Sequence, residues 1–276
     1  MTGLPGFRAH PLALALGLLL LVVHHVAVRS PRERRRAEGA VVLALAVTIW
    51  PVGDVAASVS LSVATVQRLV IMLAVTPLVL SSVPLDTWVR LTRPAPLDAV
   101  ASRLAHPGVA LLLVSVLGTI SLLPVVVDAG ARSTLGRFLV LFLTTAAGLE
   151  LWIPILAPIP GARHLSALAR SGFLFAASLT VTSLSFVWIF AHHSLYPALQ
   201  GQRPLLGLSP LADQQVAGFV AKLGAYLPMW AVAFTIFSRA DRAGVVESSP
   251  LHWADVERHL ERADRRAARA RGRRVG

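Results

Sequence analysis

The stretch LSVATVQRLVIMLAVTPLVLSS, residues 61–82, decides the fold, because Arg68 is its only charged side chain. The hydrocarbon core of a bilayer is about 30 Å thick and accommodates about 20 predominantly apolar residues in a helix. The stretch therefore predicts a membrane-spanning helix.

The rest of the chain repeats this pattern. Of its 276 residues, 55% are hydrophobic and 14% are charged, whereas soluble domains carry about 25% charged residues. Six more apolar segments are long enough to span a bilayer, at about 11–28, 40–57, 108–128, 138–159, 171–192 and 215–237. The predicted fold is an all-α polytopic bundle of seven transmembrane helices.

The basic residues predict the orientation of this bundle. If the amino terminus is outside, the segments 29–39, 83–107, 160–170 and 238–276 are cytoplasmic and hold 20 arginines, against four in the exterior segments. Basic residues prefer the cytoplasmic side, so we expect an exterior amino terminus and a cytoplasmic carboxyl terminus. The net charge of +12 lies mainly in short loops and a tail, so we expect no nucleic-acid partner.

The two ends of the chain carry further expectations. A cleaved signal peptide is the alternative for the first apolar segment, but its five arginines follow the apolar run rather than precede it, which favours a retained helix. Residues 1–238 form the predicted transmembrane domain, and residues 239–276 form a basic cytoplasmic tail. Ser249 and Pro250 predict the start of an amphipathic helix there. We expect this helix to lie on anionic lipid, with a docking helix for a partner as the alternative.

Polar side chains within or beside the apolar segments are functional candidates, because each is costly in a membrane unless it is paired or hydrated. Glu150 is expected to pair with Arg68 or Lys222, and Lys222 lies about 10 Å along its helix. The alternatives are a single ion pair that fixes helix packing and a lysine that extends to the interface. The whole predicted network comprises Asp54, Gln67, Arg68, Asp128, Glu150, Asp213, Gln214, Gln215 and Lys222.

The motif DQQVAG, residues 213–218, opens the last apolar segment. Asp213 is a good amino-terminal cap for that helix. Ala217 and Gly218 are small enough to let another helix approach closely.

Metal-binding and catalytic residues are scarce. The chain has no cysteine, which excludes disulfides and thiol ligands. His192 and His193 are the metal candidates, although adjacent residues on a helix point about 100° apart and do not chelate one ion. No nucleotide-binding loop, nucleophile elbow or zinc-protease helix is present, so we expect a protein that is not an enzyme.

Several motifs in order resemble the CtaG-like cytochrome c oxidase assembly factors of bacteria. The first lies in IWPVGDVAASVSLSVATVQRLVIMLAVTPLVL, residues 49–80, with a Trp-Pro pair, an Asp, a Gln and a Pro-Leu pair. The stretch 106–130 resembles the next segment, and a Gly-x-x-x-Trp-x-Pro motif follows at residues 148–154. LYP at 195–197 and DQQVAG at 213–218 resemble the final signature. The resemblance runs from about 49 to 238.

This resemblance implies a bacterial plasma-membrane protein that contacts cytochrome c oxidase subunits during assembly and handles copper on the outer side. Family members usually carry histidines at the positions of Ala64, Arg68 and Leu122. Imidazoles are suitable copper ligands, and a cationic Arg68 would repel a metal ion. We therefore expect a divergent assembly factor in which a charge network replaces a metal site. The alternative is a transporter of small solutes or ions with a polar path through Arg68, Glu150 and Lys222.

Overall fold

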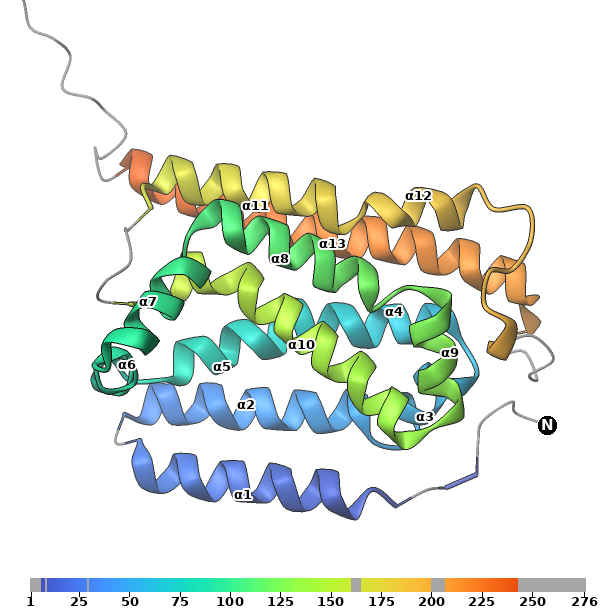
Figure 1. Ribbon diagram of the computed structural model, residues 1–276, viewed down its shortest axis with the longest axis horizontal. Coiled ribbons are helices and arrows are strands. Elements are labelled where there is room, and N and C mark those ends of the chain that lie inside the picture. The colour runs from blue at the N-terminus through green and yellow to red at the C-terminus, as the bar shows by residue number, and fades with distance from the viewer. Residues whose placement is uncertain (1–5, 8, 29, 160–164, 200–206, 243–276) are drawn as a thin grey trace, which may run out of the picture.

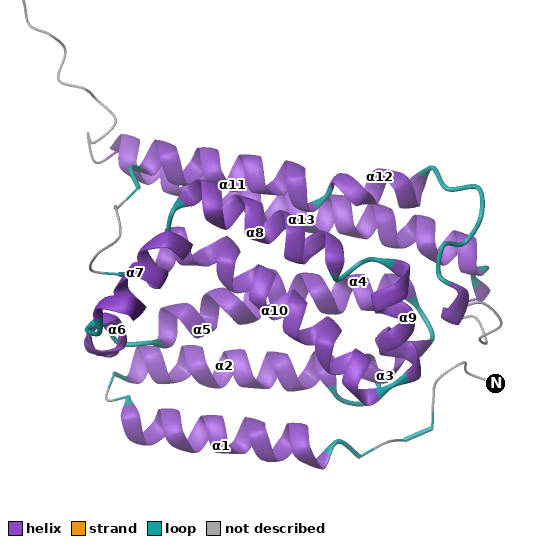
Figure 2. Cartoon of the chain, viewed as in Figure 1, coloured by secondary structure: helices purple, strands orange, loops and turns teal. Residues whose placement is uncertain are grey.

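The computed structural model describes residues 6–7, 9–28, 30–159, 165–199 and 207–242, and this part of the chain is helical without strands (Figure 2). The helix predicted after Ser249 lies outside the described residues. The elements are α1 (Pro11–Ala27), α2 (Pro31–Thr48), α3 (Val52–Ser58), α4 (Leu61–Val70), η1 (Ile71–Val75), α5 (Thr76–Ser82), α6 (Leu85–Thr92), α7 (Ala95–Leu104), α8 (Pro107–Ile120), α9 (Pro124–Arg132), α10 (Thr134–Leu156), α11 (Ala167–Val181), α12 (Ser183–Ile189), η2 (Pro197–Leu199) and α13 (Pro210–Arg242).

The long helices run back and forth along the longest axis of the molecule (Figure 1). The short helices α3 and α9 lie at one end, and α6 and α7 lie at the opposite end. The connections that the arginine distribution assigns to the exterior therefore gather at the α3–α9 end. Those assigned to the cytoplasm gather at the other end.

Four helical stretches are long and apolar enough to cross a membrane: Leu61–Ser82, Thr134–Leu156, Ala167–Ile189 and Pro210–Arg242. The count rises to six if each of two bent pairs is one span; these are α2 with α3, bent by 49°, and α7 with α8, bent by 74°. Large apolar side chains such as Leu16, Phe142, Leu227 and Phe234 are exposed on the outside of the bundle, as expected where lipid is the solvent. The chain is a multi-pass membrane protein.

The described helices show fewer than the seven separate spans that the sequence predicts. The first predicted segment contains a shorter apolar helix, Ala13–Val22. The predicted segment 108–128 is divided, because α8 ends at Ile120 and α9 begins at Pro124. Proline lacks a backbone donor and keeps the preceding residue out of helical conformation, so it ends α8 early.

Two connections expected as loops are helical. The arginines of residues 29–39 lie largely in the first turns of α2, which begins at Pro31. In residues 83–107, α6 follows Pro84 and α7 follows Pro94, since proline fits the start of a helix. Both α6 and α7 expose apolar residues, including Leu85, Val89 and Leu97.

The core is built where α5, α8, α10, α11 and α13 meet. Its fully buried side chains include Val114, Leu151, Leu174 and Met229. A second cluster around Leu61, Trp188 and Tyr196 joins α4, α12 and η2 at the α3–α9 end. These two clusters fix the helices that surround the polar site described next.

Candidate functional site

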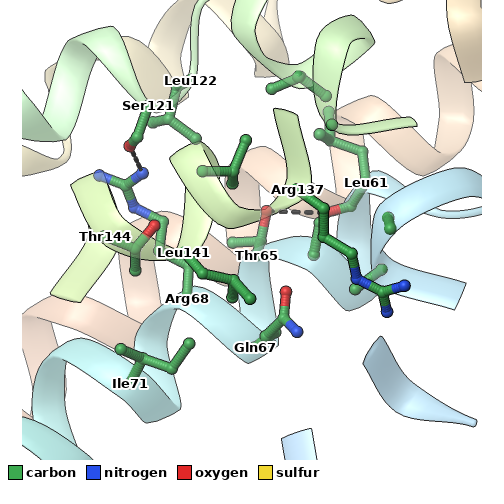
Figure 3. Close-up of a pocket in the computed structure, with 16 residues that line it drawn as sticks. Leu61, Thr65, Gln67, Arg68, Ile71, Ser121, Leu122, Arg137, Leu141 and Thr144 are labelled. Carbon is green, nitrogen blue, oxygen red and sulfur yellow. Dashed lines mark hydrogen bonds between the residues drawn. The ribbon is translucent and has the colours of Figure 1, made fainter. Parts of the chain in front are cut away.

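A cavity of about 50 Å³ lies between α3, α4, α9, α10 and the connection between α8 and α9. Its walls are largely apolar, with Leu122, Ile71 and Leu141 among them, and Arg68 is its most buried charged group (Figure 3). Ala64, Arg68 and Leu122, the three positions where the resemblance implies histidines, all line it. The structure therefore brings Leu122, from a distant part of the sequence, beside Ala64 and Arg68, which lie one helical turn apart on α4.

The Arg68 side chain is held by neutral acceptors. Its side chain is 8% exposed, and one guanidinium nitrogen donates to the Ser121 hydroxyl while the other donates to the Gly118 carbonyl oxygen at 2.8 Å. Figure 3 shows the guanidinium directed from α4 toward Ser121. Arg68 therefore links α4 to the end of α8.

The break between α8 and α9 creates this arrangement. The last carbonyl groups of a helix have no partner within it, and they form its partly negative end. The Gly118 carbonyl oxygen accepts from Arg68 and from the Ser121 hydroxyl, each at 2.8 Å, and the Tyr196 hydroxyl donates to the Leu122 carbonyl oxygen at 2.8 Å. Burial raises the pKa of Tyr196, which keeps this hydroxyl protonated and able to donate.

A second charged cluster lies toward the α3–α9 end of the cavity. Asp54 on α3 is 3% exposed and accepts hydrogen bonds from Arg137 at 2.6 Å and from His10 at 3.0 Å. Arg137 lines the cavity with its side chain but carries its guanidinium away from Arg68 (Figure 3). Asp54 thus joins α3, α10 and the segment before α1.

Asp213 holds the start of α4 in place. Its carboxylate accepts hydrogen bonds from the Leu61 backbone N–H at 2.6 Å and the Ser60 hydroxyl at 2.8 Å. The prediction that Asp213 caps its own helix is wrong: α13 begins at Pro210, and the Ser209 hydroxyl accepts from the Ala212 N–H. Asp213 instead satisfies orphan donors of another helix.

The two glutamines after Asp213 hold the connection before η2. The Gln214 side-chain oxygen accepts from the Leu195 N–H at 2.8 Å, and the Gln215 amide donates to the Ala191 carbonyl oxygen at 3.3 Å. Gly218 confirms the expected close approach, because a Cβ built there would lie 2.9 Å from the Ser185 carbonyl oxygen of α12.

Gln67 and Asp128 also bind backbone rather than one another. The Gln67 amide donates to the Val47 carbonyl oxygen at 2.5 Å. The Asp128 carboxylate accepts from the Ala198 N–H at 3.2 Å. Each of them ties together segments that are distant in the sequence.

The charge network expected around Glu150 is not formed. Among the described residues, neither Arg68 nor Lys222 makes an ion pair with Glu150, Asp54 or Asp128. The Lys222 ammonium lies 4.0 Å from the ring centroid of Phe186 and 3.1 Å from the Tyr226 hydroxyl, so aromatic faces stabilise it. One Glu150 carboxyl oxygen is buried without a hydrogen-bond partner. Arg68, Lys222 and Glu150 therefore lie in separate environments rather than in one network.

The residues at the cavity do not fit a copper ion. Ala64 and Leu122 provide no ligand atom, and the Arg68 guanidinium is a cation that only donates hydrogen bonds. His192 and His193 are both exposed after α12. In the described ranges of the chain, no group of three or more His, Cys, Asp or Glu side chains is arranged to hold a metal.

Sequence reasoning missed four contributors to these sites: Ser121, Arg137, Tyr196 and His10. Tyr196 lies in the LYP stretch, so its motif was noticed without its role. Ser121 and Arg137 carried a weaker signal, namely a hydroxyl shortly before Pro124 and an arginine at the edge of an apolar segment. Their partners lie 53 and 83 positions away in the chain, which periodicity cannot reveal.

Comparison with known proteins agrees with the motif order. A family model described as cytochrome c oxidase caa3 assembly factor (Caa3_CtaG) matches residues 11–243. No curated protein and no solved structure matched the chain in the corresponding searches.

Proposed function

Because the chain belongs to the cytochrome c oxidase caa3 assembly factor family, we propose that it helps assemble a haem–copper cytochrome c oxidase in the bacterial plasma membrane. The observation that carries this proposal is the extent of the match, residues 11–243, which includes every helix from α1 to α13. The proposed role is contact with oxidase subunits during assembly, without catalysis.

The proposed orientation places the α3–α9 end outside and the α6–α7 end in the cytoplasm, with seven helices crossing the bilayer. The arginine distribution supports it, since the connections at the α6–α7 end carry most of the arginines outside the tail. The tail from residue 239 then lies on the cytoplasmic side, where its arginines would bind anionic lipid.

Copper delivery on the outer face is not included in this proposal. In the cavity that combines positions 64, 68 and 122, none of these three residues supplies a metal ligand, and the Arg68 cation opposes a metal ion. His192 and His193 remain the only proposed donors. Metal analysis of the purified full chain tests them: stoichiometric copper that disappears in the His192→Ala, His193→Ala double variant would show that they hold copper.

The transporter alternative is not favoured. The family match concerns assembly, and the path through Arg68, Glu150 and Lys222 lacks continuity. Arg68 lines the 50 Å³ cavity and a smaller one of about 20 Å³, whereas Glu150 and Lys222 line neither of these two.

Deletion of the gene tests the assembly role. We expect reduced-minus-oxidised spectra of the membranes to lose the absorbance of the oxidase haems, and cytochrome c oxidation to fall in parallel. Succinate dehydrogenase activity, which needs no haem–copper centre, is the control and should be unchanged. Restoring the wild-type gene should restore the oxidase. Unchanged oxidase in the deletion strain, including in copper-limited medium, would contradict the proposal.

A further inference from the structure

We propose that the cavity beside Arg68 binds a small monovalent anion, between chloride and bicarbonate in size. This inference is independent of the oxidase role. It rests on the charge, the free donors and the dimensions of the cavity.

The charge of the cavity comes from Arg68. Arg68 is 8% exposed, and within the described residues no carboxylate pairs with it. The other cationic wall residue, Arg137, is already neutralised by Asp54 at 2.6 Å. The cavity therefore carries one net positive charge in surroundings of low polarity, where a counter-ion is strongly favoured.

Neighbouring dipoles compensate this charge only in part. The carboxyl end of α8, which Arg68 touches at Gly118, is equivalent to about half a negative charge. The Ser121 hydroxyl adds a neutral acceptor. Roughly half of the guanidinium charge therefore still lacks compensation.

Arg68 has more hydrogen-bond donors than its protein contacts use. A guanidinium has five N–H donors and no acceptor, and the contacts to Ser121 and Gly118 account for two of them. The remaining donors suit an anion better than a neutral ligand, since charge-assisted hydrogen bonds are roughly twice as strong. The Thr144 side chain lies on the same part of the cavity wall (Figure 3).

The size and polarity of the cavity limit the kind of anion that fits. The cavity volume of about 50 Å³ exceeds the roughly 10–15 Å³ that a cavity needs to hold one water molecule. The cavity therefore accommodates one small ion with one or two waters. Apolar walls such as Ile71 and Leu141 disfavour strongly hydrated divalent anions, and a single cation cannot neutralise them. This selects a monovalent ion.

We infer that the ion enters from the α3–α9 end, because the cavity extends toward it. The wall begins at Ala56 on α3 and Gly130 on α9, and it reaches inward along α4 past Arg68 to Ile71. On the proposed topology, the ion would enter from the outer surface.

The rival explanation is that Arg68 serves only as a cap for α8 and that water fills the cavity. Both explanations give Arg68 a structural role, but only the anion site makes stability depend on which anion is present. The test therefore compares salts at constant sodium concentration and ionic strength.

Purified full chain in detergent is unfolded thermally in sodium chloride, sodium bromide and sodium gluconate. Chloride and bromide should raise Tm, by about 3 °C for each tenfold increase above the Kd, whereas gluconate is too large to enter. Arg68→Gln should abolish the difference between chloride and gluconate. Arg132→Gln is the matched control, because Arg132 is an exposed cation at the same end of the bundle, and it should retain the difference.

If Arg68→Gln fails to fold, the wild type and Arg68→Lys still decide the question. Chloride-35 NMR of the wild type should show excess line broadening that disappears when bromide displaces the bound chloride. Arg68→Lys, which keeps the charge, should still bind chloride, but with weaker affinity. Equal Tm values for the wild type in chloride and gluconate would overturn the proposal. So would a chloride effect that persists unchanged in a folded Arg68→Gln.

Discussion

At the residue scale, one carboxylate links two helices. Asp213 belongs to α13 but binds the Leu61 N–H and the Ser60 hydroxyl at the start of α4. Hydrogen bonds to a charged group contribute more than neutral ones. The polar opening of α13 is therefore explained by a neighbouring helix rather than by α13 itself.

Removal of this carboxylate should destabilise the bundle. We expect Asp213→Ala to lower the free energy of unfolding by about 2 kcal/mol, because the buried start of α4 loses its acceptor. Gln215→Ala, two residues away, is the control, since its 3.3 Å bond to Ala191 is long and its loss should cost less than about 1 kcal/mol. Denaturant unfolding in detergent measures both. Equal stability of the two variants would show that the α4 contact contributes no more than the long Gln215 hydrogen bond.

At the element scale, close helix approach depends on glycine. Between α4 and α5 the helix widens into the π-turn η1, and the Met72 carbonyl oxygen there accepts a hydrogen bond from the Trp152 indole at 2.7 Å. Gly148 lies one turn earlier on α10, and a Cβ added to it would lie 2.8 Å from Thr76 and 3.0 Å from the Met72 Cα. The spacing of Gly148 and Trp152 is therefore a packing motif.

This contact predicts opposite outcomes for two glycine substitutions. Gly148→Ala should cost about 2 kcal/mol, since it forces α10 away from the backbone of η1. Gly172→Ala should be neutral or slightly stabilising, because nothing lies within 4 Å of a Cβ there and alanine favours helix. Thermal unfolding of the two purified variants makes the comparison. If Gly148→Ala is as stable as the wild type, α10 can move away from η1 without loss of stability.

Helices were largely predictable at this scale, and their contacts were not. The apolar run of residues 61–82 has the bounds of the α4–η1–α5 stretch, since length and hydropathy decide a span. The end of α8 was missed although Pro124 was visible, because overall hydropathy outweighed one proline. Asp54 with Arg137 and Asp213 with Leu61 depend on which helices become neighbours, which one sequence does not reveal.

At the scale of the whole molecule, cysteine labelling can measure the orientation of the bundle in the membrane. The chain has no cysteine, so each introduced cysteine is a unique label. Thr134→Cys, exposed at the α3–α9 end, should react with a membrane-impermeant maleimide on intact cells. Ala95→Cys, exposed at the α6–α7 end, should react only after the membrane is permeabilised. The reverse pattern would invert the proposed topology.

The length of α13 has a consequence for the lipid. This helix has 33 residues, and its apolar part from Val216 to Phe237 spans about 33 Å at 1.5 Å per residue. Asp213 and Gln215 lie before this part, and Arg239 and Arg242 lie after it, so the helix matches a bilayer of about that thickness. In a thinner bilayer it must tilt or bend at Pro228. Because Asp213 is hydrogen-bonded to the start of α4, such a tilt would also move the helix that carries Arg68. The acyl-chain length of the lipid would then influence the geometry of the cavity beside Arg68.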